Sequence, residues 1–320
     1  MAADSPSFSI VIPSHNRADL LAACLNSVRR HAPSGTQIVV VDDGSPDRQV
    51  SKTAEAFNGV ETVHLPKRRG FCVAANVGIR QASGSIVELL NDDTEVASGW
   101  AEPALEAFRD KAIGAVAPLV LYHSSDKVDS AGDRYYWGGV AGKRGHNQPF
   151  VPGLYRPAKV FGASGSSAFL RREAFLRVGG FPESFGAYFE DVDLAFRLHR
   201  AGFQVQFEPR SRVLHRVSAS YGKPSRSLLE QQSLNEERVF WRNLPWPDLL
   251  QALPHHLAVL AAKAFVRWRN GGLAPFLSGR LRLLSETADL IAHRRRLADL
   301  GPGGNVRGWS VDRTYPKDGT

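Results

Sequence analysis

Short apolar runs alternate with stretches of helical periodicity through the first 90 residues, and this alternation restricts the chain to few folds. Residues 8–12, 38–41 and 86–90 are mostly apolar and rich in Val and Ile, which is typical of strands buried on both faces of a parallel sheet. We expect strands at 8–12, 38–41, 61–65 and 86–90, and helices at 17–31, 49–57 and 71–83. The alternation predicts an α/β protein with a Rossmann-like, mostly parallel sheet and flanking helices.

The pattern is less regular after residue 114. Strands are expected at 116–122, 203–207 and 212–215, helices at 172–178 and 188–200, a Gly- and aromatic-rich excursion at 129–153, and a flexible loop entering a strand at 160–170. Beyond residue 225 the sequence is helical and rich in Arg and Trp. We therefore divide the chain into an α/β domain at 1–224 and a helical C-terminal appendage at 225–320.

Composition narrows the class of partner and the cellular location. The formal charge of +8 suits an anionic partner, but the basic residues form no dedicated stripe, so no nucleic-acid partner is expected. The two cysteines, Cys24 and Cys72, exclude a disulfide framework and favour a reducing compartment. The N-terminal sequence has no signal-peptide pattern. The best candidate for a membrane span, 249–266, is interrupted by Pro254 and by polar residues. We expect a cytoplasmic protein that at most rests on a membrane.

Acidic pairs follow two of the predicted strands. Asp42 and Asp43 come directly after the second strand, and Asp92 and Asp93 come just after the fourth. Because ligands of doubly wound sheets bind at the carboxyl ends of the strands, these acids point to one site. Paired carboxylates bind a hard divalent cation or the hydroxyls of a sugar. A bound cation can also neutralise a departing diphosphate.

Each of these signals also has a structural explanation. Either acidic pair alone suits a tight turn or a helix cap. Glu190 and Asp191 suit a helix N-terminus, and His215 suits an ordinary position in a strand. The chain lacks the Gly-x-Gly-x-x-Gly, P-loop and Gly-x-Ser-x-Gly motifs of dinucleotide-binding, nucleotide-hydrolysing and serine-hydrolase sites.

Several motifs together resemble those of family 2 glycosyltransferases, which are inverting enzymes of the GT-A fold, in the branch that includes bacterial rhamnosyltransferases and other cell-surface glycan enzymes. The resemblance covers residues 8 to 220, and its motifs follow the family's order. They stand at residues 12–17, 41–45, 70–78, 89–94, 163–165, 178–181 and 188–194. Asn91 occupies the place of the more frequent first Asp of the Asp-x-Asp motif.

The resemblance implies a role for each candidate residue. On the donor side, the nucleotide sugar is bound by Pro13, Asp42, Asp43, Asn76, Asp92 and Asp93. Asp93 and His215 bind a divalent metal, Mn²⁺ or Mg²⁺. Asp191 is the catalytic base that deprotonates the acceptor hydroxyl, and Ser164, Gly165 and Glu190 lie on the acceptor side.

The function implied is the transfer of one sugar from a UDP- or dTDP-linked donor to a glycan or polyprenyl-linked acceptor in cell-surface polysaccharide synthesis. The Gln-x-x-Arg-Trp signature of processive members is absent, which favours a single addition. A non-catalytic nucleotide-sugar or glycan-binding scaffold of the same fold remains an alternative. The Arg- and Trp-rich appendage suits contact with the cytoplasmic face of the inner membrane, and equally suits packing on the catalytic domain or on a second subunit in a homodimer.

Overall fold

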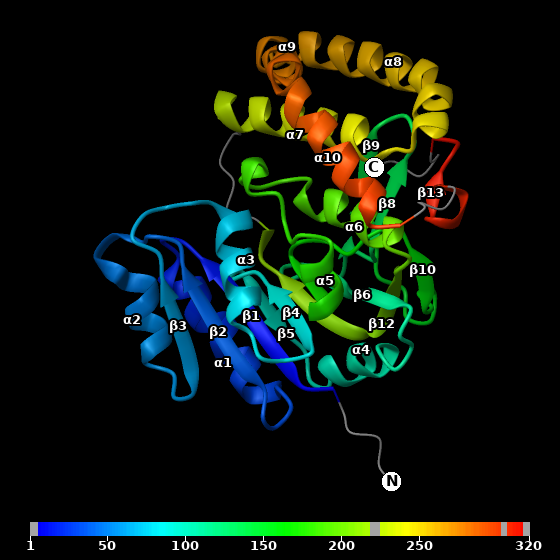
Figure 1. Cartoon of the computed structure of the whole chain (residues 1–320). Helices are drawn as coiled ribbons and strands as arrows, with labels where there is room; N and C mark the ends of the chain where they lie inside the picture. The colour runs from blue at the N-terminus through cyan, green and yellow to red at the C-terminus, as the bar shows by residue number, and fades with distance from the viewer. Residues whose placement is uncertain (1–5, 218–224, 302–305, 316–320) are drawn as a thin grey trace.

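The computed structural model describes residues 6–217, 225–301 and 306–315. A ten-stranded sheet crosses the molecule, with helices on both faces and a layer of C-terminal helices at one end (Figure 1). Its main path runs β10 (Ala158–Val160), β12 (Gln204–His215), β6 (Ile113–Tyr122), β11 (Ser167–Arg171), β4 (Ile86–Leu90), β1 (Phe8–Ser14), β2 (Gln37–Asp42) and β3 (Val60–His64). Only β10 and β11 run antiparallel to their neighbours on this path, so the predicted α/β architecture is confirmed.

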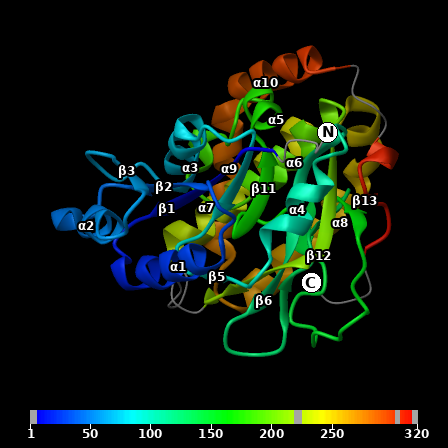
Figure 2. The same cartoon turned by 90° about the horizontal axis from the view of Figure 1, so that it is seen from below.

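Alternating side chains of the first strands build a core on each face of the sheet. Ile10 and Ile12 pack in the cluster that includes α1 (Ala18–His31), whereas Val11 packs in the cluster that includes α3 (Phe71–Gln81). Figure 2 shows α1 and α3 on opposite sides of β1 and β2. The remaining helices of this part are α2 (Gln49–Glu55), α4 (Ala101–Ala107), α5 (Arg172–Arg177) and α6 (Glu190–Arg200).

The stretch 203–215 is one strand, so the prediction of two short strands was wrong. β12 runs unbroken from Gln204 to His215, with a register shift against β6 between Glu208 and Arg212. Pro209 lies within this irregularity, where its missing N–H costs no ladder hydrogen bond. The strand therefore carries His215 to the same edge of the sheet as the acidic residues after β4.

The excursion at 129–153 is more regular than predicted. It contains the end of β7 (Val128–Ser130), which pairs with β6, and the antiparallel strands β8 (Asp133–Tyr136) and β9 (Val140–Lys143). β13 (Val311–Asp312) joins β8 in parallel and completes a second sheet of three strands. The remaining short strand, β5 (Thr94–Val96), pairs with β12.

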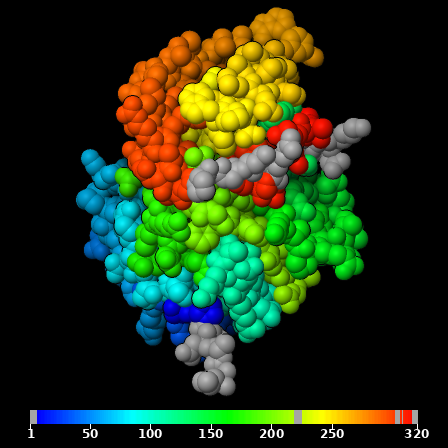
Figure 3. Space-filling view, turned by 45° about the vertical axis from the view of Figure 1, so that its right-hand side comes forward, coloured from blue at the N-terminus to red at the C-terminus, as the bar shows by residue number. Residues whose placement is uncertain are grey.

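The C-terminal helices cover the end of the molecule near α6. They are α7 (Arg226–Asn243), α8 (Trp246–Arg269), α9 (Leu273–Arg282) and α10 (Thr287–Asp299). In the space-filling view of Figure 3 they form a cap, yellow to orange, over the α/β body. Val239, Phe240 and Leu244 of this region are buried in the same hydrophobic cluster as the side chains of α3 and α6. The appendage therefore shares the core of the α/β part.

Helix α8 is continuous through Pro254, so this proline interrupts the apolar run but not the helix. His256, two residues further on, is buried against Phe240, with its ring stacked at 3.7 Å and its Nδ1 atom 2.9 Å from the Gly138 carbonyl. These contacts hold the helix where proline removes one backbone bond. Among the described residues, α8 alone is long and apolar enough to cross a membrane by length and composition, and 17% of its apolar window is buried. One such helix is weak evidence for a membrane span, because core helices of soluble proteins pass the same test.

Candidate functional site

Asp93 and His215 lie side by side at the edge of the sheet. Asp93 follows β4, and His215 ends β12, where it pairs with Thr94 of β5. This pairing brings Nε2 of His215 to 3.2 Å from Oδ1 of Asp93. Both side chains are buried. The structure therefore brings together the two residues that the resemblance implied as metal ligands.

The spacing of this pair fits a hard divalent cation. Mg²⁺ takes octahedral ligands at about 2.1 Å, so neighbouring ligand atoms lie about 3 Å apart, close to the separation of the Asp93 and His215 atoms. Within the described residues, no group of three or more His, Cys, Asp or Glu side chains is placed to hold a metal ion. A cation at this pair would complete its coordination with water and substrate phosphates.

Asp129 is a further residue of the candidate site, and the sequence analysis missed it. Its Oδ2 atom lies 2.9 Å from Nδ1 of His215, on the ring edge opposite Asp93. Lys143 lies 2.9 Å from the other oxygen of Asp129. Burial alone would raise the pKa of Asp129, but the bond with His215 and the charge of Lys143 lower it to about 2. A carboxylate in this place fixes the orientation and tautomer of a metal-binding histidine.

His215 is held between two carboxylates. Burial alone would lower its pKa, but the bonds with Asp129 and Asp93 raise it above the ordinary value. Asp129 reaches this place because β7 pairs with β6, the neighbour of β12. No local sequence pattern marks such a long-range neighbour, so the chain gives no early signal for Asp129.

Arg17 links the two acids that follow β4. Its guanidinium lies 2.8 Å from Asp92 and 3.1 Å from Asp93. Ser14 donates a hydrogen bond of 2.6 Å to the other oxygen of Asp92. Burial raises the pKa of Asp92 to about 6, against the opposing effects of Arg17 and Ser14. Both oxygens of Asp92 are therefore in contact with protein groups, Arg17 and Ser14. Asp93 instead has one oxygen beside His215.

Asp42 and Asp43 shape the loops around the first two strands. Asp42 is fully buried and accepts hydrogen bonds from Ser45, Ser51 and His64. Burial alone would raise its pKa, but these bonds lower it. Asp43 accepts backbone hydrogen bonds of 2.6 and 2.8 Å from residues 69 and 70. Both acids therefore organise the loops at this edge of the sheet.

The remaining donor-side candidates lie in different surroundings. Pro13 is buried in β1, in register with Val41. Asn76 is 2% exposed, and its amide exchanges two hydrogen bonds of 2.8 Å with the backbone of Phe181. It lines a separate cavity beside α5 and α10. The structure therefore gives Asn76 a positioning role and does not bring it to the Asp93–His215 pair.

Asp191 lies at the start of α6, where a glycine loop contacts it. The backbone N–H of Gly165 donates to its Oδ2 atom at 2.9 Å. A Cβ at Gly165 would stand 3.3 Å from Glu190 and 3.6 Å from Asp191. Ser164, next in the loop, is buried and bonds with Ser166. The structure thus brings Ser164, Gly165, Glu190 and Asp191 together, as the resemblance implied.

The loop before Asp191 adopts a strained conformation that α7 stabilises. Tyr188 and Phe189 have φ angles of 71° and 68°, which costs of order 1–3 kcal/mol each for such residues. Asn235 of α7 is fully buried. Its amide lies 2.9, 3.0 and 2.9 Å from the carbonyls of residues 185, 187 and 188. The appendage therefore positions the segment that carries Asp191, which the sequence did not predict.

Buried charges surround Asp191. Burial and the nearby charge of Asp191 raise the pKa of Glu190 well above its ordinary value, and the same two causes raise the pKa of Asp133. Burial alone would lower the pKa of Lys143, but Asp129 and the other nearby carboxylates raise it. Lys143 thus connects the surroundings of Asp191 with the Asp129–His215 pair.

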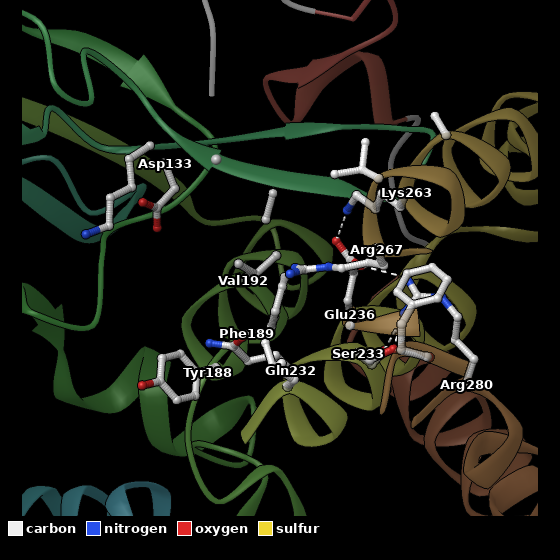
Figure 4. Close-up of a pocket in the computed structure, with 18 of the residues that line it drawn as sticks. Asp133, Tyr188, Phe189, Val192, Gln232, Ser233, Glu236, Lys263, Arg267 and Arg280 are labelled. Carbon is white, nitrogen blue, oxygen red and sulfur yellow. Dashed lines mark hydrogen bonds and ion pairs between the residues drawn. The ribbon is translucent and has the colours of Figure 1, made fainter. Parts of the chain in front are cut away.

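A cavity of about 860 Å³ opens between Asp191 and the C-terminal helices. Asp133, Lys143 and Asp191 line its α/β side, and α7, α8 and α9 line the opposite side. Figure 4 shows Asp133 on the opposite side of this space from Lys263 and Arg267. A volume of this size accommodates a substrate of several rings. An acceptor bound here would have its hydroxyl beside Asp191.

Comparison with known proteins finds matches to one enzyme family. The sequence profile described as Glycosyl transferase family 2 matches residues 9–179. The pre-mycofactocin glycosyltransferase of Mycobacterium tuberculosis is 30% identical over 209 residues, which are 65% of this chain and 42% of that protein. The N-acetylglucosaminyl-diphospho-decaprenol L-rhamnosyltransferase of the same organism is 28% identical over 217 residues, which are 60% of this chain and 70% of that protein. The chain thus spans less than half the length of the first of these relatives.

A solved structure shows the same fold. The mannosyltransferase PcManGT from Pyrobaculum calidifontis, in complex with GDP-Man and Mn²⁺, superposes with a TM-score of 0.55 at 21% sequence identity. The match covers 92% of this chain and 85% of that one. The likeness extends over the C-terminal helices as well as the sheet, and it confirms the GT-A fold.

Proposed function

The chain belongs to glycosyl transferase family 2, and on that premise we propose that it is an inverting, metal-dependent enzyme that transfers one sugar from a nucleoside diphosphate to a glycan or lipid-linked acceptor. The observation that carries the proposal is the pairing of Asp93 with His215 at 3.2 Å, which Asp129 and Lys143 connect to the surroundings of Asp191. The relatives described above are a glycosyltransferase and a rhamnosyltransferase by name. We propose cell-surface glycan synthesis as the process in which the enzyme acts.

The donor binds at the sheet edge between the acids after β2 and those after β4. Asp93 and His215 are the residues that would hold a divalent cation, Mn²⁺ or Mg²⁺, and such a cation would supply positive charge to neutralise the departing diphosphate. Asp129 keeps the His215 ring oriented with its Nε2 atom toward Asp93. The fold neighbour was solved with a nucleotide sugar and Mn²⁺, which supports this assignment. UDP- and dTDP-linked sugars are the donors that we favour.

The acceptor binds in the cavity between α6 and the appendage. Asp191 accepts the proton of the attacking hydroxyl, with one oxygen oriented by the Gly165 N–H. Glu190 is enclosed beside it, where burial and the charge of Asp191 raise its pKa. The sugar is then attacked on the face opposite the diphosphate, which inverts the anomeric centre.

A thermal-shift screen tests the proposal. UDP-, dTDP- and GDP-linked sugars are each added with Mn²⁺ and with EDTA, and ligand binding to the folded state raises the melting temperature. We expect one nucleotide to stabilise the protein only with Mn²⁺, and Asp93→Ala to abolish that stabilisation. Asp191→Asn should keep the stabilisation and lose sugar transfer. Full transfer by Asp191→Asn would remove this residue from the mechanism, and no metal-dependent stabilisation by any nucleotide would contradict the donor site.

We also propose that the appendage rests on a membrane through one face of α8. Trp246, Leu250, Leu257, Phe265 and Trp268, here called the α8 stripe, are each at least 56% exposed. At 100° per residue they fall within one side of the helix. An exposed apolar stripe with Trp at both ends is typical of a helix lying in the membrane interface. The only acidic residue of α8, Asp248, is buried.

Vesicle flotation tests the membrane contact. The chain should float with vesicles of phosphatidylglycerol and phosphatidylcholine, and a Phe265→Ser, Trp268→Ser double variant should stay in the soluble fraction. A Leu154→Ser variant is the matched control, because Leu154 is 67% exposed and lies far from α8 in the sequence. Flotation of both variants to the same extent would exclude the α8 stripe as the contact. A concentration-dependent dimer that the double variant disrupts would assign the stripe to self-association instead.

A further inference from the structure

The cavity beside Asp191 has opposite charge character at its two ends. On the α/β side it is lined by two carboxylates, Asp133 and Asp191, and by one cation, Lys143. On the appendage side it is lined by three cations, Lys263, Arg267 and Arg280, and by one carboxylate, Glu236. The side chains that line the far end therefore carry a net positive charge.

Two of these three cations already have protein partners. Glu236 bonds with Lys263 and lies 2.8 Å from Arg280. Arg280 also lies 3.2 Å from Glu237. Within the described residues, the guanidinium of Arg267 makes no hydrogen bond or ion pair with protein. Figure 4 shows its side chain extending from α8 into the cavity.

Apolar side chains also line this side of the cavity, where Arg267 itself is exposed. Val266 precedes it on α8, Leu229 lines the wall from α7 and Phe276 from α9. A guanidinium that is open to a cavity presents a planar fork of N–H donors, which matches the oxygens of a phosphate. A ligand that matches this end carries both an anionic group and an apolar group.

We propose that Arg267 binds the phosphate or diphosphate of a lipid-linked acceptor whose sugar hydroxyl lies at Asp191. This assignment rests on the proposed function and names the acceptor class for the same cavity. At the acidic end, Asp191 accepts the proton of the neutral acceptor hydroxyl. At the basic end, Arg267 binds the anionic phosphate that links the sugar to the lipid. Arg267 is therefore a specificity-determining residue that discriminates phosphate-linked acceptors from neutral glycans.

Calorimetric titration of the full chain in EDTA tests the proposal. The probes are farnesyl diphosphate, farnesol as the uncharged lipid, and inorganic pyrophosphate as the free anion. Farnesyl diphosphate should bind most tightly of the three, and Arg267→Gln should weaken its binding about tenfold or more. The matched control is Arg269→Gln, which removes the same charge two residues further along the same helix without lining the cavity.

Two further variants separate this site from the donor site. Asp93→Ala should bind farnesyl diphosphate as the wild type does, and Arg267→Gln should keep its stabilisation by nucleotide and Mn²⁺. Equal losses in Arg267→Gln and Arg269→Gln would show general surface attraction and overturn the proposal. So would no binding by the wild type, unchanged binding by Arg267→Gln, or loss of binding in Asp93→Ala. Equal affinity for pyrophosphate and farnesyl diphosphate would overturn the lipid part.

Discussion

The Nδ1 atom of His215 lies 2.9 Å from Oδ2 of Asp129, at the ring edge turned away from Asp93. The two residues are 86 positions apart in the sequence and meet through neighbouring strands. A carboxylate on one ring nitrogen fixes the proton there and leaves the other nitrogen free to bind a cation. In the proposed metal site, Asp129 would thus be a determinant of metal affinity without being a ligand.

Removing this carboxylate should weaken metal binding. We expect Asp129→Asn to raise the Mn²⁺ concentration needed for half-maximal activity about 10- to 100-fold, the usual cost of losing such a partner. Activity measured across a Mn²⁺ titration gives this value directly. Asp126→Asn is the control, since Asp126 is exposed three residues earlier. An unchanged Mn²⁺ requirement in Asp129→Asn would contradict the orienting role.

The buried carboxyl group of Glu88 should make the free energy of unfolding depend on pH. It is fully buried in β4, and burial raises its pKa to about 8 despite hydrogen bonds from Trp100 and Ser167. Between pH 4.5 and 8 the folded state keeps this proton and the unfolded state has lost it. The free energy of unfolding therefore falls as pH rises through that window, by up to about 1.4 kcal/mol per pH unit from this group.

Urea denaturation at several pH values measures this slope. Glu88→Gln cannot titrate, so its stability should fall less steeply than that of the wild type between pH 5 and 8, whatever its absolute stability. Glu102→Gln, an exposed substitution of the same type, should leave the wild-type slope unchanged. Identical slopes for wild type and Glu88→Gln would show that Glu88 is ionised in the folded protein.

Asn235 should affect catalysis from a distance. Asn235→Ala removes the donor that holds the carbonyls of the 185–188 loop and leaves those buried groups unpaired, at a cost of about 1–3 kcal/mol in stability. The loop then places Asp191 less accurately, so kcat should fall about tenfold or more while stabilisation by donor and Mn²⁺ is retained. Asn270→Ala, at the exposed end of α8, is the control. A folded Asn235→Ala variant with normal kcat would exclude the positioning role.

Gly44 and Gly35 form a matched pair for testing the donor loop. Both have left-handed backbone conformations, with φ of 67° and 81°, so alanine costs about 1–2 kcal/mol of backbone strain at either position. A Cβ at Gly44 would also stand 2.4 Å from the backbone carbon of Lys67, whereas one at Gly35 would meet nothing within 4 Å. Gly44→Ala should therefore lose the nucleotide-dependent thermal shift, and Gly35→Ala should keep it. Equal shifts in both variants would show that this close approach is not needed for nucleotide binding.

The sequence predicts the parts of this protein that depend on nearby residues. The first strands and helices are set by local periodicity, so β4 was predicted with its observed bounds and β1, β2 and β3 within two residues at each end. Asp93 and Asp191 were identified because they stand in short motifs. His215 needed the resemblance, since a histidine that ends a strand has no distinctive local pattern.

The missed residues depend on contacts between distant segments. Asp129 and Asp133 lie in a stretch that reads as irregular, because β7, β8 and β9 are short and are stabilised by pairing with partners elsewhere. Asn235 acts on a loop about 50 residues earlier in the chain. Such relationships appear only when the tertiary structure is known, since no local propensity or spacing encodes them.

The parallel pairing of β13 with β8 also has a consequence for biosynthesis. Asp312 lies 2.9 Å from Arg134, next to Asp133 at the cavity, although the two residues are 178 positions apart. A ribosome releases the whole ten-stranded sheet before it releases residues 311 and 312. The strand that pairs with β8 is therefore a late addition to a nascent chain. The proposed acceptor cavity would be complete only after this strand has been added.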